Sequence, residues 1–178
     1  MALKYNTTTI PVTGTIKYKN TSLKKVIYNK TTVWEQEVRQ YFFNNGTVSS
    51  GGFHAVAVNG FDWGWGGTMT TTGTITNPTS TTMQFTGNTS HYDSFFSQWA
   101  NNLTYYKKLV IVVTSAKDVQ FGVTNSGKVV GYTGPHININ SAGTYSIDTS
   151  SLTGDYYIAV CIKGKGHLQF SQIYFIQN

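Results

Sequence analysis

The chain has 178 residues, of which only 11% are charged whereas 15% are aromatic. Intrinsically disordered proteins show the reverse balance, so this composition excludes that class and predicts one domain with a short extension. The remaining polar residues are mostly Thr, Asn, Ser and Gly, which suit half-buried strands and tight turns and therefore favour a sandwich or barrel.

Positive charge is concentrated near the N-terminus. The net charge is +6, and seven of the 13 basic residues fall in the first 40 positions: Lys4, Lys17, Lys19, Lys24, Lys25, Lys30 and Arg39. Such a region can contact nucleic acid, an anionic cell-wall polymer or an acidic partner, or it can keep strand edges from aggregating. Nucleic-acid sites are usually denser in Arg and Lys, so no nucleic-acid partner is predicted.

The N-terminal region is predicted to form an arm and a hairpin. Two short β-patterns, residues 24–28 and 31–35, are separated by Asn29-Lys30, which is the spacing of a two-residue hairpin turn. A hairpin this small is not stable alone, so it must pack on the main body or on another chain. The predicted domains are an arm with an attachment hairpin, 1–40, and a β-sandwich, 41–178.

The first part of the sandwich contains three strand candidates and one helix candidate. The strands are predicted at residues 53–58, 68–75 and 81–85, with Asn77-Pro78 as a turn between the last two. Apolar residues then recur at spacings of three and four: Tyr92, Phe95, Phe96, Trp99 and Leu103. This stripe, with Asp93 as N-cap, predicts about three helical turns that close one end of the sandwich.

The C-terminal half carries the most regular strand pattern. Residues 109–113 are apolar on both faces, which predicts a central strand, and Val119, Phe121 and Val123 alternate with polar neighbours. Further strand candidates follow at near-regular spacing: 128–132, 145–148, 156–162 and 168–176. This rhythm predicts an all-β, antiparallel two-sheet sandwich of the jelly-roll or galactose-binding-like type.

No constellation of catalytic or metal-binding residues is predicted. Glu35 and Glu37 share one face of a strand but lie on the small hairpin, and Asp148 and Asp155 lack the pattern of a calcium loop. The histidines do not stand at a zinc spacing, and neither a Gly-x-Ser-x-Gly elbow nor a phosphate-binding loop occurs. We therefore predict a protein that is not an enzyme and that needs no cofactor or metal.

The sequence also gives expectations about redox chemistry and localisation. Cys161 is the single cysteine, which excludes an intrachain disulfide, and its apolar neighbours predict a small buried side chain. Apolar stretches are too short to span a membrane, and residues 1–5 lack the apolar segment of a signal peptide. We expect synthesis in a cytoplasm, no export by the standard route and no membrane partner.

The strongest candidate for ligand contact is the run Phe61-Asp62-Trp63-Gly64-Trp65-Gly66-Gly67. In an extended chain, Trp63 and Trp65 project to the same face. Indole rings stack on the apolar C–H faces of sugars, and the Asp62 carboxylate can accept hydrogen bonds from sugar hydroxyls. The alternative is that both Trp side chains cap the edge of the sandwich as packing residues.

The hairpin region carries a resemblance. The stretch Leu23-Lys24-Lys25-Val26-Ile27-Tyr28-Asn29-Lys30-Thr31-Thr32-Val33-Trp34-Glu35 looks like a short hairpin found in structural proteins of bacteriophages that infect Gram-positive bacteria. There, a Lys-Lys-Val-Tyr-like strand, a turn and a Val-Trp-Glu end recur near tail, baseplate or fibre modules. The resemblance implies contact with other virion proteins through Lys24, Lys25, Tyr28 and Trp34.

A second resemblance covers the C-terminal strands. The order Gly143–Asp148, Gly154–Ile158 and Phe170–Phe175 is similar to the last strands of carbohydrate-binding-like jelly rolls. In those domains a tyrosine strand is followed by a Leu-x-Gly turn, a Tyr-Tyr strand and a closing strand. This resemblance implies a fold rather than a particular ligand.

Together the two resemblances imply a bacteriophage virion protein that is assembled in the host cytoplasm. The first hypothesis is a tail or baseplate receptor-binding component, expected to be a homotrimer, whose jelly-roll domain recognises a host-surface polysaccharide. A capsid decoration or head-fibre protein is one alternative, and a free carbohydrate-binding module is another.

Overall fold

The chain forms two compact units, Met1–Val38 and Arg39–Asn178. The computed structural model describes residues 3–5, 8–10, 17–18, 21–23, 25–28, 31–49, 52–56, 69–70, 73–88, 92–125 and 132–177. Arg39 and Gln40, predicted from the sequence to belong to the arm, are the first residues of strand β7 (Arg39–Asn44) in the second unit. The two units are described separately below.

The described residues of the first unit form three two-stranded antiparallel sheets. Their strands are β1 (Leu3–Tyr5), β2 (Thr8–Ile10), β3 (Lys17–Tyr18), β4 (Thr21–Ser22), β5 (Lys25–Tyr28) and β6 (Thr31–Glu35). In the third sheet, β5 and β6 pair from Lys25 opposite Glu35 to Tyr28 opposite Thr31. This pairing confirms the predicted hairpin.

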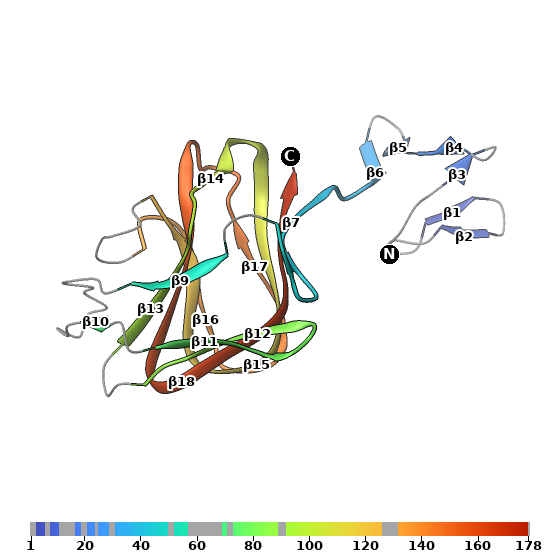
Figure 1. Cartoon of the computed structure of the whole chain (residues 1–178). Coiled ribbons are helices and arrows are strands. Elements are labelled where there is room, and N and C mark those ends of the chain that lie inside the picture. Colours follow the sequence, from blue (N-terminus) through green and yellow to red (C-terminus); the bar gives the residue numbers. More distant parts are fainter. Residues whose placement is uncertain are drawn as a thin grey trace. The chain divides into compact units, whose positions relative to one another are not determined.

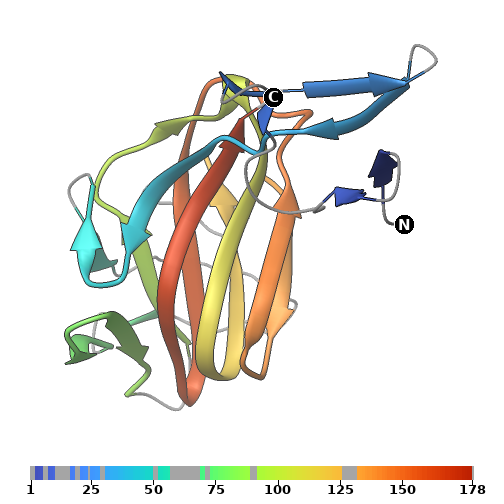
Figure 2. The ribbon, with the colours of Figure 1, turned by 90° about the vertical axis from the view of Figure 1, so that its right-hand side faces the viewer.

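Two long strands organise the second unit (Figure 1). They are β15 (Tyr106–Thr124) and β18 (Asp155–Gln177), which pair antiparallel along almost their whole length. The other edge of β18 is lined in turn by β13 (Tyr92–Ser97), β12 (Thr82–Thr86) and β7. The other edge of β15 is lined by β17 (Gly143–Asp148) and β16 (His136–Ile139). Figure 2 shows β18 in red, β15 in yellow and β17 in orange side by side.

Shorter elements complete this unit. They are β8 (Thr47–Val48), β9 (Phe53–Val56), β10 (Met69–Thr70), β11 (Thr74–Thr79), β14 (Asn101–Asn102) and the 3-10 helix η1 (Leu103–Tyr105). The pairing of β10 with β13 is parallel, and the other pairings given by the described residues are antiparallel. Asn77-Pro78, predicted as a turn, lies within β11 at a register shift, and the turn follows at Ser80-Thr81.

A bend in each long strand folds the sheet over on itself. The sequence predicted separate strands at 109–113 and 119–123, and again at 156–162 and 168–176, but each pair belongs to one continuous strand. The bend is a bulge in which Asp118, at φ 56°, faces residues 163–166 of β18. An added Cβ at Gly166 would lie 2.4 Å from the Lys117 carbonyl oxygen, so the strands approach too closely there for any side chain. Bulges of this kind let one strand serve both layers of a sandwich.

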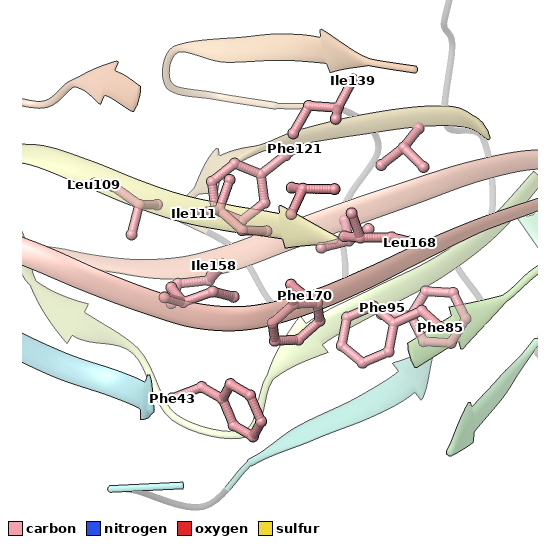
Figure 3. Packing of buried hydrophobic residues seen from close by; sticks show 14 of the residues in the cluster. Phe43, Phe85, Phe95, Leu109, Ile111, Phe121, Ile139, Ile158, Leu168 and Phe170 are labelled. Carbon is pink, nitrogen blue, oxygen red and sulfur yellow. The ribbon is translucent and has the colours of Figure 1, made fainter. Parts of the chain in front are cut away.

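The two halves of the curved sheet enclose one apolar core (Figure 3). The Phe85 and Phe95 rings are stacked, with centroids 4.6 Å apart, and the Phe170 ring packs edge-on against Phe43 and Phe85. Residues from both halves of β15, such as Leu109 and Phe121, belong to this cluster. The architecture confirms the prediction of an all-β, antiparallel sandwich.

The predicted helix is wrong. Residues 92–97 form strand β13, and only Leu103–Tyr105 adopt a single 3-10 turn. Residues 93–97 are all buried, because β13 is covered on both faces, and such a strand shows no alternation that would distinguish it from a helix. Asp93 is not an N-cap, and Trp99 is 60% exposed and lies outside the core.

Candidate functional site

A polar cleft of about 220 Å³ lies on the outer face of the sheet, where β13, β18, β15 and β16 lie side by side. It is lined by Tyr92, Asp118, Val119, Gln120, Asn138, Asn140, Cys161 and Lys163. Four of these residues are exposed, so the cleft opens to solvent: Asp118, Asn138, Asn140 and Lys163. Its volume is below the roughly 300–1,000 Å³ of pockets for drug-sized ligands, so it suits a single ring or a short stretch of chain.

Strand pairing and alternation explain how these side chains meet. Gln120 lies directly between Cys161 of β18 and Asn138 of β16, which places the three residues in one cross-strand row. The neighbours of Gln120 on β15, Val119 and Phe121, are buried in the core, so the Gln120 side chain projects to the opposite, outer face. Cross-strand neighbours on one face lie close enough to share a ligand.

The adjoining row contains the charged residues of the cleft. Tyr92 of β13 pairs with Lys163 of β18, immediately before the bend. Asp118 occupies the bulge on β15, where its backbone N–H donates to Asn140 Oδ1 at 2.8 Å. The bulge therefore re-aims Asp118 at the rim of the cleft, as bulges beside functional sites commonly do.

Two amide side chains of the cleft have hydrogen-bonding capacity that the described residues do not use. Gln120 Oε1 is buried and has no hydrogen-bond donor among the described residues. The neighbouring Asn138 amide has no partner there either. A buried acceptor without a partner costs roughly 1–3 kcal/mol, so a bound hydroxyl group would relieve this cost. The side chains of the cleft can thus accept hydrogen bonds from a neutral polar ligand and donate hydrogen bonds to it.

An aromatic cluster supports the sheet beside the cleft. The Tyr132 ring is stacked on His136, with centroids 4.6 Å apart, and its hydroxyl donates to the Gln120 carbonyl oxygen at 2.9 Å. Burial raises the pKa of Tyr132 well above its usual value, so the phenol keeps the proton that it donates. Gly122 makes room for this ring, because an added Cβ would lie 2.7 Å from Tyr132 Cδ1. The backbone under Gln120 is therefore held rigidly.

Cys161 lies in the floor of the cleft and is 3% exposed. Burial raises the pKa of its thiol well above the usual value, and the nearby Asp93 carboxylate adds to the rise, although a hydrogen bond with Ser94 opposes it. We expect a thiol reagent such as dithionitrobenzoate to label the native protein at least about 100-fold more slowly than the urea-unfolded chain, because only the thiolate reacts. Stoichiometric labelling of the native protein within seconds would contradict this expectation.

The sequence-predicted binding residues are not among the described residues that line this cleft. Asp62, Trp63 and Trp65 lie outside the described residues, as does Lys24, so their predicted roles stay predictions. Lys25 is exposed on β5. Tyr28 and Trp34 contribute backbone to β5 and β6, and their side chains lie outside the described part.

Sequence reasoning missed the residues that form the cleft. The alternation Ile137-Asn138-Ile139-Asn140 is the signal that could have revealed this strand, and it places both Asn side chains on the face opposite the isoleucines. This strand lies beside Gln120, and on the same face as Tyr92, only because strands far apart in the chain pair with one another. Tyr92 was assigned to the helical stripe, which concealed its position on a sheet.

A second pair of polar side chains has the elements of acid–base chemistry. Ser115 Oγ and His167 Nε2 are 2.7 Å apart on the outer face near the bend. Within the described residues His167 has no carboxylate partner, and a hydrolytic triad needs that third group.

The Asp148 carboxylate accepts hydrogen bonds from the hydroxyl and the backbone N–H of Ser150, two positions later. These hydrogen bonds lower the pKa of its carboxyl group.

The described residues contain neither a candidate metal centre nor a candidate membrane-spanning helix, and the chain matches no known family model and no curated sequence. In the described part of the chain, no group of three or more His, Cys, Asp or Glu side chains could hold a metal ion. No helix formed by those residues has the length and apolar character needed to cross a membrane. No model of a known protein family matches the chain, and no curated protein matches its sequence.

Proposed function

We propose that the protein is a non-catalytic carbohydrate-binding protein that recognises a glycan through the cleft on β13, β18, β15 and β16. The observation that carries this proposal is the pair Gln120 and Asn138. These cross-strand neighbours bring amide groups without a described protein partner into a cleft that also contains the Tyr92 side chain. Amides that exchange hydrogen bonds with hydroxyls, beside an aromatic ring, are the groups that a sugar requires.

The biological setting that we propose is a bacteriophage virion, with the glycan on the surface of the host. The support for this setting is the resemblance of residues 23–35 to hairpins of phage structural proteins. The division into two units also fits this setting, because an attachment hairpin and a binding domain would be separate modules. A homotrimeric tail or baseplate component that docks on other virion proteins is the form we propose.

The proposed function is tested with a double variant of the cleft. We expect Gln120→Ala with Asn138→Ala to lower affinity by about tenfold or more, because each lost hydrogen bond contributes about 1 kcal/mol to binding. Binding is measured on an immobilised panel of bacterial capsule, cell-wall and lipopolysaccharide glycans. Molar mass is measured on the same samples.

A matched control is available on the same sheet. Gln84 lies on β12, is half-buried, and donates through Nε2 to Thr86 Oγ1 at 3.0 Å without lining the cleft. Gln84→Ala should therefore bind glycans like the wild type. If the wild type binds no glycan of the panel, or if the double variant binds as well as the control, the cleft is not a carbohydrate site.

A further inference from the structure

The exposed aromatic side chains described in the second unit are on one loop. Among the described residues, the large hydrophobic side chains that are exposed include two aromatic ones, Trp99 at 60% and Tyr105 at 70%. They lie six positions apart, between the end of β13 and the start of β15. Neither ring stacks on another described ring. The segment from Trp99 to Tyr105 is called the aromatic loop below.

The backbone of the aromatic loop is held at several points. The buried Ser97 hydroxyl donates to the Trp99 carbonyl oxygen at 2.9 Å, and Asn102 Oδ1 accepts from the Thr104 backbone N–H at 3.1 Å. Leu103 is 1% exposed and anchors the loop in the core. A loop fixed in this way loses little conformational entropy when its exposed rings bind a ligand.

The loop is also tied to the neighbouring strand. The Leu103 backbone N–H donates to the Gly154 carbonyl oxygen at 2.8 Å, and the Gly154 N–H donates to Thr104 Oγ1 at 3.0 Å. Asn102 pairs with Asp155, whose side chain is exposed. The loop thus carries two exposed aromatic rings on a hydrogen-bonded backbone, and it pairs with a strand whose first residue has an exposed carboxylate.

The surroundings of the rings favour a sugar over a protein partner. Residues 98–106 contain no charged side chain, and their polar groups are amides and hydroxyls. A protein interface needs an apolar centre within roughly 800 Å² per partner. The other exposed large hydrophobic side chain described in this unit is Val48, on the short strand β8, so no extended apolar patch is present in the described part. A neutral sugar ring needs only one or two aromatic faces and neighbouring hydrogen-bonding groups.

We propose that the aromatic loop is a second carbohydrate-contacting site, at which Trp99 and Tyr105 stack on the C–H faces of neutral sugar rings. The exposed Asp155 carboxylate and the loop amides supply hydrogen bonds to the sugar hydroxyls. This site is separate from the cleft, since Tyr92 begins β13 and Trp99 follows its last residue, Ser97, and a strand of this length spans roughly 17 Å. The inference does not depend on binding in the cleft.

The site is tested with neutral hexasaccharides of β-1,4-linked glucose and β-1,4-linked N-acetylglucosamine, and with a galacturonate hexasaccharide as a charged comparison. We expect at least one neutral hexasaccharide to shift the tryptophan fluorescence of the wild type. Trp99→Ala should lower its affinity by about tenfold, and Trp99→Phe should restore part of it, because an aromatic face remains. Val48→Ala, which removes an exposed apolar side chain elsewhere, should bind like the wild type.

The two proposed sites are distinguished by which substitution lowers the affinity for the oligosaccharide. Lower affinity in Trp99→Ala with unchanged affinity in Gln120→Ala supports the aromatic loop and counts against the cleft. Lower affinity in Gln120→Ala with unchanged affinity in Trp99→Ala overturns the inference and supports the cleft as the binding site. The inference is also overturned if neither neutral hexasaccharide binds, or if Trp99→Ala changes only the molar mass in solution, which would make the loop an interface between copies of the chain.

Discussion

The substitution Phe170→Ala should lower the free energy of unfolding of the sandwich by about 3–5 kcal/mol. The Phe170 ring is fully buried and lies at the centre of an aromatic group, with ring centroids at 5.2 Å from both Phe43 and Phe85 and at 6.1 Å from Phe53. Truncation removes the transfer free energy of the ring and leaves a cavity. Rings that are supported by other strands cannot collapse fully to fill it.

The measurement is urea unfolding followed by near-ultraviolet circular dichroism, with the midpoint compared at constant slope. Tyr105→Ala is the matched control, because it removes an aromatic ring of similar size that is 70% exposed. The control should change the free energy of unfolding by less than about 0.5 kcal/mol. A loss below about 1 kcal/mol for Phe170→Ala would mean that this ring is not part of a packed core.

The second large effect is expected at Asp93, which lies beside the cleft on β13 and is fully buried. Its two carboxylate oxygens accept from different loops: Oδ1 from the Gly73 N–H at 2.9 Å and Oδ2 from the Asn88 N–H at 2.8 Å. In Asp93→Asn, one of these oxygens becomes an NH₂ group that faces a backbone donor. We expect the free energy of unfolding to fall by about 2–4 kcal/mol, since a hydrogen bond to a charged group is lost and a buried donor is left unsatisfied.

Asp155→Asn is the control for this substitution, because it makes the same change in charge at an exposed position of β18. Equal unfolding midpoints for the two variants would show that Asp93 does not hold the loops around Gly73 and Asn88. Asp93→Ala adds a further comparison, since it leaves both backbone donors unsatisfied and removes packing atoms. It should be at least as destabilised as Asp93→Asn.

Local patterns predicted those elements whose character is set by neighbours in the chain. The hairpin at 24–35 was recognised from two β-patterns and a two-residue spacing, and both determine pairing locally. Residues 109–113 were predicted as a central strand because they are apolar on both faces, and they pair with β17 on one side and β18 on the other. The burial of Cys161 followed from its apolar neighbours in the same way.

Local patterns failed where long-range packing determined the structure. Residues 93–97 are all buried, so the apolar spacing of this strand resembled that of a helix. The long strands β15 and β18 were each predicted as two strands, and both interruptions fall at the bulge, where Asp118 and Gly164 have positive φ angles. They form a bend instead, since the two strands stay paired on both sides of the bulge.

The sequence by itself determined the all-β class, the hairpin and the buried strands, because composition and alternation act through neighbouring residues. The cleft and the aromatic loop were decided only by the tertiary structure. Gln120 meets Asn138 and Cys161 through pairings across three strands, and these pairings are selected by the shared core on the opposite face of the sheet. Trp99 is 60% exposed, whereas Leu103, four positions later, packs in the core.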